Sequence, residues 1–528
     1  MRKYLAILKT KDRFDWLFLA SSVLLVIIAF WLHLYRLPEV PYGIHIDEAG
    51  MAYDAWSLAN YGTDRYNIKY PVYLLNFGMG QSALYAYMTM GLITFFDINM
   101  WTIRLPGALA SLGMILAGSL FIRDYWHNRW AGLLGGLLLT IAPYFIMQSR
   151  FGLDCNLFVN FAVISLYLLS LAQNKKSFWL YVLAGLSWGI TLYTYALSWL
   201  VVAFYLLLVG FFLIKYKQIN LKQSIAFSFP LVLLATPLVI FAVINFFSLS
   251  QVELFGLTIP RLLLFRVNEL SGHNLGTNFL TILQNSFFKD WLDYNAFDFF
   301  GPLYPISIPL CVLGFGLGTW TIIRQFRQKV LLSSGLVWLL FISVWLFGLF
   351  ISGPNINKMN GIYFGWVFWL VWALAWLWQK VKFGRIFVMV VLFVYLILFG
   401  SFAKYYFTVY SSHIYPQYLF AGDFATGWAY VSNRFPTQTI YFEESYIYYL
   451  LGSRRPPINN DMYDFMVYSK QGRYHFMLPE YIDMEAVYII RETNYHFQNR
   501  LKNIGFILDW SDEIYQVWKA NEMTCLIK

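Results

Sequence analysis

The sequence predicts an all-α polytopic membrane protein of about eleven transmembrane helices, followed by a small extracytoplasmic α/β domain. Of the 528 residues, 59% are hydrophobic and only 12% are charged, whereas soluble domains carry about 25% charged residues. The mean hydropathy is +0.54. Uncharged runs recur at the length of a bilayer crossing, and the composition changes after residue 400. Water is therefore not the main solvent of this chain.

Apolar runs of about 17 to 22 residues, the length that a transmembrane helix requires, occur throughout the first 400 residues. They fall at 16–35, 102–122, 130–147, 155–173, 225–247, 305–323, 331–351, 360–379 and 384–400. The uncharged stretch 177–214 has about twice the length of one span, so we expect it to cross twice, with a turn near TYALS. The first run lacks a small-residue cleavage site and is interpreted as a retained helix. Together these runs predict eleven crossings.

Basic residues gather in the short loops on one side of these crossings. The clusters are Arg2, Lys3, Lys9, Lys11 and Arg13; Arg123 and Arg129; Lys175 and Lys176; Lys215, Lys217 and Lys222; Arg324, Arg327 and Lys329; Lys380, Lys382 and Arg385. The positive-inside rule makes this side cytoplasmic, which places the N-terminus in the cytoplasm and the chain after about residue 401 outside it. The agreement requires that the apolar stretch 81–96 does not span, so we interpret it as a re-entrant or interfacial helix.

Two domains are predicted. Residues 1–400 form the transmembrane domain, with a first outer loop at 37–100 and a second large outer loop at 248–304. Residues 401–528 contain the strand-like segments IYFEESYIYYLL, AVYIIRE and EIYQVWKA among polar helical stretches. This pattern predicts a soluble extracytoplasmic α/β domain.

Composition excludes several classes of protein. The net charge of +10 does not indicate nucleic-acid binding, because the basic residues lie in loop clusters rather than along one face. Cys155, Cys311 and Cys525 are too few and too far apart for a disulfide framework or a cysteine metal site. No dense cluster of His, Asp and Glu occurs, so no obligatory metal or other cofactor is predicted, and a divalent metal is left open.

Polar residues near the outer membrane face are candidate site residues, because an ionisable group at that depth costs free energy unless it is paired or used. They are His45, Asp47, Glu48 and Asp64 in the first outer loop, Arg104 before the second span, Arg150 and Asp154 in QSRFGLDCN, Arg261, Arg266, His273 and Asn274 in the second large loop, and Lys358 in SGPNINKMNG. Each has a simpler explanation, such as an acidic helix start, a local ion pair or a snorkelling lysine. Their convergence on one side favours a shared site.

An outer pocket with carboxylates and basic residues beside lipid suits chemistry on a lipid-linked phosphate. Arg or Lys would bind the phosphate leaving group. A carboxylate would take a proton from an acceptor hydroxyl. Transfer of a sugar from a polyprenyl-phosphate donor meets both demands, whereas a transporter more typically has its charges at the bilayer midplane.

The motifs of the first 175 residues resemble those of a known family. The DEA at 47–49 followed by a helix, then IRLPGALASL from Ile103 and SRFGLD from Ser149, are similar to the C-type (GT-C) membrane glycosyltransferases. The resemblance is closest to the family 39-like branch of protein O-mannosyltransferases and lipid A aminoarabinose transferases. It covers about residues 15–400 in architecture.

The resemblance implies roles for individual residues. Asp47 would be the general base or the carboxylate that orients the acceptor, with Glu48 completing the acidic pair and Asp154 in the same pocket. Lys358 and Arg104 would contact the donor phosphate. Where the aminoarabinose transferases have an acidic and a basic residue, this chain has Gly80 and Gln81. The phosphate would therefore fall to Lys358, Arg150, or Arg261 and Arg266, with His45, Asp64, His273 and Asn274 left as candidate contacts for the acceptor or sugar.

The leading hypothesis is a hexosyltransferase-like, inverting membrane enzyme. It would take a sugar from a polyprenyl-phosphate donor and attach it to a hydroxyl of an extracytoplasmic acceptor: a cell-surface glycan, a teichoic acid or a protein. Inversion is implied by the resemblance, and no nucleotide site is needed. Two alternatives stay open: a flippase or transporter of lipid-linked oligosaccharides, and an oligosaccharide ligase or polymerase on the same scaffold.

Overall fold

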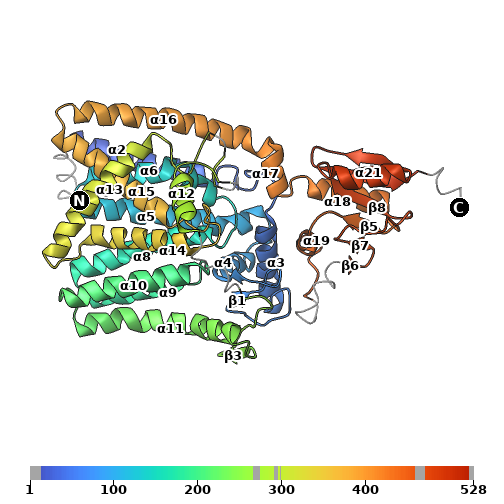
Figure 1. The fold of residues 1–528 in the computed structure, drawn as a ribbon, viewed down its shortest axis with the longest axis horizontal. Coiled ribbons are helices and arrows are strands. Elements are labelled where there is room, and N and C mark those ends of the chain that lie inside the picture. The colour runs from blue at the N-terminus through green and yellow to red at the C-terminus, as the bar shows by residue number, and fades with distance from the viewer. Residues whose placement is uncertain (1–12, 266–273, 291–294, 298, 458–469, 522–528) are drawn as a thin grey trace, which may run out of the picture.

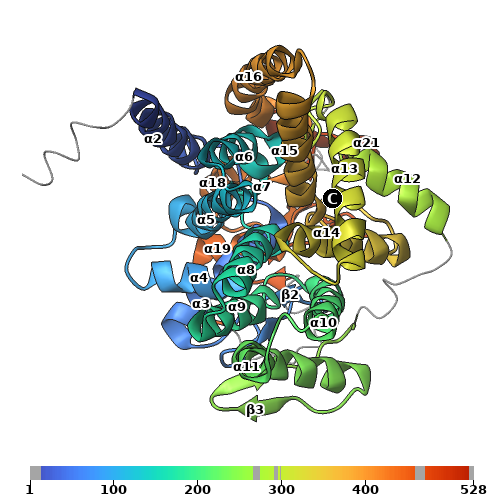
Figure 2. The same ribbon diagram turned by 90° about the vertical axis from the view of Figure 1, so that its left-hand side faces the viewer.

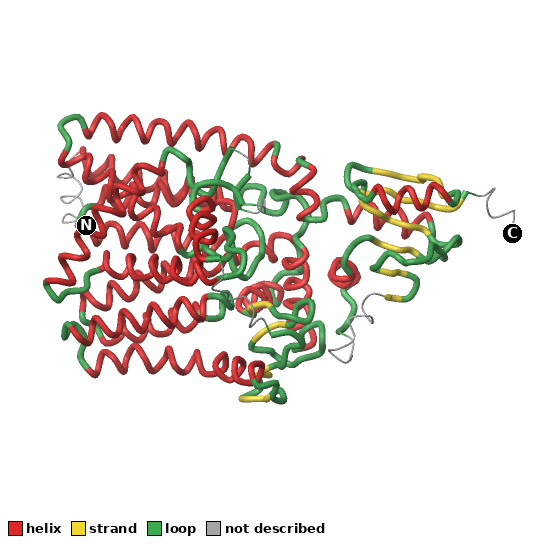
Figure 3. Tube along the Cα trace, viewed as in Figure 1, coloured by secondary structure: helices red, strands yellow, loops and turns green. Residues whose placement is uncertain are grey.

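The computed structural model describes residues 13–265, 274–290, 295–297, 299–457 and 470–521. A bundle of long helices forms most of this part of the chain, and a small sheet domain lies beyond one end of the bundle (Figures 1 and 3). The bundle consists of α2 (Arg13–Leu34), α5 (Met100–Trp126), α6 (Arg129–Ile141), α7 (Pro143–Gln148), α8 (Asn156–Lys175), α9 (Phe178–Thr191), α10 (Ser198–Lys215), α11 (Leu221–Phe246), α13 (Ser307–Arg327), α14 (Ser333–Phe350), α15 (Ile362–Lys380) and α16 (Gly384–Thr408).

Nine helices of the described chain are long and apolar enough to cross a membrane. The fold predicted from the sequence, a polytopic helical membrane protein, is confirmed. The two other predicted crossings, α6 and α9, have 13 and 14 residues, which is about 20 Å of helix. The run at 130–147 is divided because Ala142 is extended (ψ 134°) and Pro143 begins α7, where its missing N–H is not needed.

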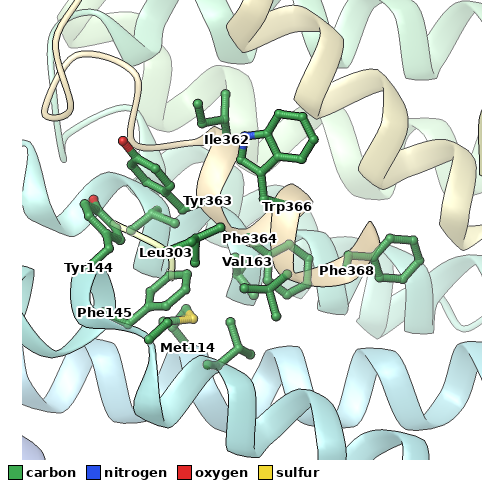
Figure 4. Close-up of a cluster of buried hydrophobic side chains, with 14 of the residues drawn as sticks. Met114, Tyr144, Phe145, Val163, Leu303, Ile362, Tyr363, Phe364, Trp366 and Phe368 are labelled. Carbon is green, nitrogen blue, oxygen red and sulfur yellow. The ribbon is translucent and has the colours of Figure 1, made fainter. Parts of the chain in front are cut away.

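The most buried helices of the bundle are α8 and α15, and its rim faces the surroundings. In their most apolar windows 72% and 67% of the residues are buried, whereas the share is 17% in α2 and 22% in both α11 and α16. Figure 4 shows Tyr363, Phe364 and Trp366 of α15 among side chains of neighbouring helices. Gly314 lets α13 approach α15 closely, because an added Cβ would lie 1.8 Å from the carbonyl oxygen of Trp369. Small residues have this role in many membrane bundles.

Short elements cover one end of the bundle, which we call the outer end. They are α3 (Ile46–Tyr61), β1 (Tyr73–Leu74), β2 (Gln81–Ser82), α4 (Leu84–Ile93), the hairpin of β3 (Val252–Leu254) and β4 (Leu257–Ile259), and α12 (Leu275–Asn285). The stretch 81–96, expected as a re-entrant or interfacial helix, forms β2 and α4. The ten residues of α4 extend about 15 Å, half of the hydrocarbon thickness.

The C-terminal part contains a six-stranded sheet with the order β6-β7-β5-β8-β10-β9. Its elements follow α16 as η2 (Tyr410–Ser412), α17 (Ile414–Leu419), α18 (Phe424–Arg434), β5 (Ile440–Phe442), α19 (Tyr446–Ser453), β6 (Lys470–Gln471), β7 (Tyr474–His475), β8 (Val487–Arg491), α21 (Tyr495–Asn503), β9 (Phe506–Ser511) and β10 (Tyr515–Ala520). β5 is parallel to β7 and β8, and the other pairs are antiparallel. The predicted small α/β domain is confirmed. In IYFEESYIYYLL only the first residues are a strand, because the Ser445 hydroxyl caps α19 by accepting from the Ile447 amide.

The C-terminal domain packs directly on the first outer loop. α19 contacts α3, and the Tyr53 hydroxyl donates to the carbonyl of Arg455 at 2.6 Å. Arg454 forms an ion pair with Asp97 at 3.1 Å. The helix that bears the predicted catalytic carboxylate is therefore held between the bundle and the sheet domain.

Candidate active site

A cavity of about 510 Å³ lies at the outer end of the bundle, within the usual range of ligand sites. Separate segments of the chain build its wall: the start of α3, the glycine-rich turn before β2, the loop before α8, the turn between α9 and α10, the end of α11 with the loop after β4, and the loop before α15. The lining residues are His45, Asp47, Tyr73, Asn76, Phe77, Met79, Gly80, Gln81, Leu153, Asp154, Cys155, Tyr195, Ala196, Leu197, Trp199, Leu200, Phe241, Ala242, Phe246, Leu262, Leu264, Phe265, Asn355, Asn357 and Lys358.

Asp47 lies in the first turn of α3, where the helix dipole favours a negative charge. Its side chain is 37% exposed and faces the cavity. The Asn76 amide donates to Asp47 Oδ1 at 2.8 Å. The N-cap residue is His45, whose Nδ1 accepts from the Asp47 amide at 3.1 Å. Burial lowers the pKa of His45, although the nearby Asp47 and Glu48 charges oppose the shift. A neutral imidazole therefore caps the helix beside the carboxylate.

Asp154 is the second carboxylate on the cavity wall. The amides of Ser82 and Cys155 donate to its two oxygens, at 3.0 and 2.7 Å. Burial raises the pKa of Asp154 to about 6, helped by the charge of Asp47, while the backbone donors oppose the shift. Asp47 and Asp154 both line this cavity, so the two carboxylates share one site.

Lys358 brings a cation to the wall of the same cavity. It lies in the loop between α14 and α15, and its Nζ donates to the carbonyl of Ser352 at 3.0 Å. The backbone of this loop is fixed by Asn355, whose side chain accepts from the Lys358 amide at 2.8 Å. Asp290 accepts from the Ile356 amide at 2.8 Å. The Lys358 side chain is therefore presented by a well-bonded turn.

Glu48, expected to be catalytic, does not line the cavity. Its side chain is fully buried and forms an ion pair with Arg104 at 3.0 Å. It also accepts from the Gly152 amide at 2.8 Å. Arg104, expected to bind the donor phosphate, is likewise fully buried, and its remaining donors reach the carbonyls of Pro41 and Gly43 at 2.8 and 2.7 Å. This placement corrects both expectations toward a structural role, because the pair fixes the segment that leads into α3.

Arg150, also expected at the phosphate, is buried beneath the same segment. Its guanidinium donates to the carbonyls of Leu32, Tyr35 and Val40 at 2.8, 2.6 and 3.1 Å. Carbonyls in the last turn of a helix have no partner within the helix, so Arg150 completes the end of α2. It lies over the Phe407 ring, 4.9 Å from the centroid. The local Arg150–Asp154 ion pair does not form, and Arg150 does not line the cavity.

The remaining predicted residues lie elsewhere. Asp64 is buried in a cluster with Asp54 and Arg65, and burial and the Asp54 charge raise its pKa to about 8. Arg261 is half-buried in the loop that supplies Leu262 to the cavity, but does not line it. Asn274 is exposed at the start of α12. Arg266 and His273 lie outside the described residues.

Sequence reasoning missed the amide and aromatic residues of the wall. Asn76, Asn355 and Asn357 line the cavity, as do Tyr195 and Trp199. The sequence contained a signal for the three Asn residues, because they lie in segments already singled out. Asn76 begins the glycine-rich NFGMGQ, and Asn355 and Asn357 lie in the loop that contains Lys358. Among the residues that the structure describes, no group of three or more His, Cys, Asp or Glu side chains could hold a metal ion.

Comparisons with known proteins identify one matching family model and several similar solved structures. The family model of dolichyl-phosphate-mannose-protein mannosyltransferases matches residues 81–245. The structure of ArnT from Cupriavidus metallidurans bound to undecaprenyl phosphate is 14% identical and has a TM-score of 0.52, over 96% of this chain and 98% of that one. Its apo state, at 14% identity, covers 96% and 97% with a TM-score of 0.48. The archaeal oligosaccharyltransferase AglB from Archaeoglobus fulgidus is 13% identical, over 77% of this chain and 56% of that one, with a TM-score of 0.42. No curated protein matches the sequence.

The fold is that of the C-type membrane glycosyltransferases. The resemblance predicted from the sequence, to the branch of protein O-mannosyltransferases and aminoarabinose transferases, is confirmed, and ArnT has the same arrangement along nearly its whole length.

Proposed function

We propose that the protein transfers a sugar from a polyprenyl-phosphate donor to a hydroxyl group of an acceptor outside the cytoplasm. The observation that carries the proposal is the wall of the outer cavity. Two carboxylates, Asp47 and Asp154, line it together with the cation of Lys358. A base and a cation in one cavity are the groups that hydroxyl activation and phosphate departure require.

In the proposed reaction, Asp47 takes the proton of the acceptor hydroxyl as its oxygen attacks the anomeric carbon. The bond from that carbon to the phosphate oxygen breaks, and the lipid phosphate leaves with the electron pair. Lys358 balances the charge that develops on the phosphate. Asp154 orients the sugar or the acceptor. A single displacement of this kind inverts the anomeric carbon.

A second cavity supports a donor with a long apolar tail. It has a volume of about 530 Å³ and lies between α10 and α11, with Ala203, Gly210 and Ala235 among its lining residues. The outer cavity is lined by the same two helices, through Leu200 and Ala242. The nearest lining residues of the two cavities are Leu200 and Val202 on α10 and Phe241 and Ala235 on α11. They are two and six positions apart, which is about 3 and 9 Å of helix. The undecaprenyl phosphate bound to ArnT is a lipid of this class.

The test uses the purified protein in lipid vesicles, without an ion gradient. Undecaprenyl-phosphate mannose and undecaprenyl-phosphate glucose are supplied as labelled donors, with cell-wall fragments, teichoic acid or a serine-rich peptide as acceptors. We expect label on an acceptor, and a loss of about 10²–10⁴-fold in rate with Asp47→Asn. Lys358→Gln should raise the KM for the donor, and Lys358→Arg should restore part of the affinity.

The matched control is Asp97→Asn, because Asp97 is 72% exposed and does not line the cavity. It should transfer at the wild-type rate. Transfer by Asp47→Asn at the rate of this control would remove Asp47 as the base. Movement of the intact donor across the vesicle, without transfer to any acceptor, would support a flippase instead.

A further inference from the structure

The β3–β4 hairpin follows α11 at the rim of the bundle. Figures 1 and 2 both place β3 at the periphery, beside the outer end of α11. Its strands pair Val252 with Ile259 and Leu254 with Leu257. The backbone is fixed to the first outer loop, because the Val72 amide donates to the Thr258 carbonyl at 2.9 Å. The hairpin is therefore a rigid projection from the site wall.

This projection is apolar and bare. Phe255, at its tip, is 97% exposed, and Phe246 and Phe247 at its base are 62% and 65% exposed. The other exposed apolar side chains of the segment are Leu249, Val252, Leu257 and Leu264. Monomeric soluble proteins rarely expose contiguous apolar patches of this kind, and a larger patch marks an interaction surface.

The conformation of the turn does not explain the aromatic residue at its tip. Phe255 and Gly256 join the strands with φ of +52° and +80°. A two-residue hairpin with positive φ at both positions favours Asn or Asp followed by Gly. An aromatic residue in that conformation costs free energy, and the described protein gives Phe255 almost no cover. A contact outside the described protein would offset this cost.

The continuity of the surface identifies that contact. Val239, Val243 and Phe246 are exposed along α11, a helix long and apolar enough to cross a membrane. This lipid-facing strip continues toward the hairpin through the exposed Phe247 and Leu249, and Glu253 is the only charged residue in 246–260. Aromatic side chains collect at the boundary between headgroups and acyl chains.

We propose that the β3–β4 hairpin inserts Phe255 into the membrane interface at the outer end of the bundle. The chain beyond the hairpin supplies Leu262, Leu264 and Phe265 to the cavity wall. Insertion therefore holds that wall at the level of the lipid headgroups. The proposal concerns a lipid contact and does not depend on the reaction proposed above.

The test measures membrane depth with spin labels in the full-length protein. Cysteines replace Phe255, Leu207 or Tyr481 one at a time in a Cys525→Ser background, since Cys155 and Cys311 are buried. Leu207 on α10 is 73% exposed and gives the lipid reference, and Tyr481 in the C-terminal domain is 85% exposed and gives the water reference. The protein is reconstituted in vesicles of phosphatidylethanolamine and phosphatidylglycerol, and collisions with oxygen and with a nickel chelate are compared.

We expect the ratio of oxygen to nickel accessibility at 255 to exceed that at 481 several-fold and to approach the ratio at 207. A ratio equal to that at 481 would overturn the proposal. So would an immobile label that neither reagent reaches, which would indicate contact with a second copy of the chain. Phe255→Asn provides a folding control. Because Asn suits the turn, its thermal stability in detergent should not fall. A spin label at Leu257→Cys in this variant should collide less with oxygen and more with the nickel chelate than the same label beside Phe255.

Discussion

Two adjacent acidic residues have different positions, and the reason is helical geometry. Successive side chains of a helix point about 100° apart, so Asp47 faces the cavity while Glu48 faces the interior and pairs with Arg104. The sequence identified the acidic pair and the outer position of Asp154 and Lys358. It could not show that the charges of Arg104 and Arg150 are used on backbone carbonyls, because those carbonyls lie about 60 to 120 residues away in the chain.

The acid limb of the rate profile is a prediction at this scale. Since the pKa of Asp154 is raised to about 6, kcat/KM should fall as the pH is lowered through about 6, where Asp154 gains a proton. Asp154→Asn should be slower and should lose this limb. The native protein binds that proton more tightly than the unfolded chain does, so stability falls as the pH rises from 3.8 to about 6 and does not change further above that. The variant should therefore be at least as thermostable as the wild type at neutral pH. A limb that persists in the variant would assign the titration to another group.

At the scale of elements, the segment before α3 is held by hydrogen bonds from three other parts of the chain. The Ile44 amide donates to the Phe420 carbonyl at 2.5 Å, and the Tyr42 hydroxyl donates to Asp423 at 2.7 Å. Arg104 and Arg150 hold the other sides. The position of Asp47 is thus set by α17 and its surroundings as much as by α3.

Gly43→Ala tests this arrangement. Gly43 has a φ of +85°, and an added Cβ would lie 2.1 Å from the Phe420 carbonyl oxygen. We expect a cost of about 1–3 kcal/mol from the backbone alone and a loss of transfer that exceeds the loss of folded protein. The control is Gly400→Ala in α16, where an added Cβ meets nothing within 4 Å. It should be neutral or stabilising by about 1 kcal/mol. Equal melting temperatures and transfer rates for the two variants would show that these contacts do not set the position of the segment before α3.

The groove between α10 and α11 gives a second prediction for an element. Gly210 lines this cavity, and an added Cβ there meets nothing within 4 Å, so Gly210→Phe should fill the groove without unfolding the bundle. We expect a higher KM for a donor with a full-length polyprenyl tail and little change for a short-chain analogue. Gly316→Phe, at an equally open position on α13, is the control. The same KM for both donors in both variants would show that the tail lies elsewhere.

At the scale of the molecule, the sequence predicted the bundle well because apolar length and charge determine a membrane span directly. Eleven crossings were expected, and each is helical. The missed detail was local, since Pro143 divides one run and Ser445 turns a strand-like segment into a helix. The site was harder to predict because its wall combines segments as distant as Asp47 and Lys358. Neither periodicity nor charge reports which of them meet.

The sidedness of the molecule is a prediction that a reporter can test. The basic loops predict a cytoplasmic N-terminus and an extracytoplasmic C-terminal domain. Alkaline phosphatase fused after Lys528 should be active, and green fluorescent protein at that point should be dark. The reverse is expected for fusions after Lys329, in a basic loop between α13 and α14. Fluorescence from the fusion after Lys528 would contradict this topology and place the C-terminal domain in the cytoplasm.

The hydrogen bond from Ile44 to Phe420 also has a consequence for biosynthesis. It joins residues 376 positions apart, and a ribosome makes the earlier one first. The segment that carries Asp47 therefore lacks its contact with Phe420 until most of the chain has been translated and both residues have reached the same side of the membrane. This contact is therefore among the last to form, and a product truncated before Phe420 would lack it.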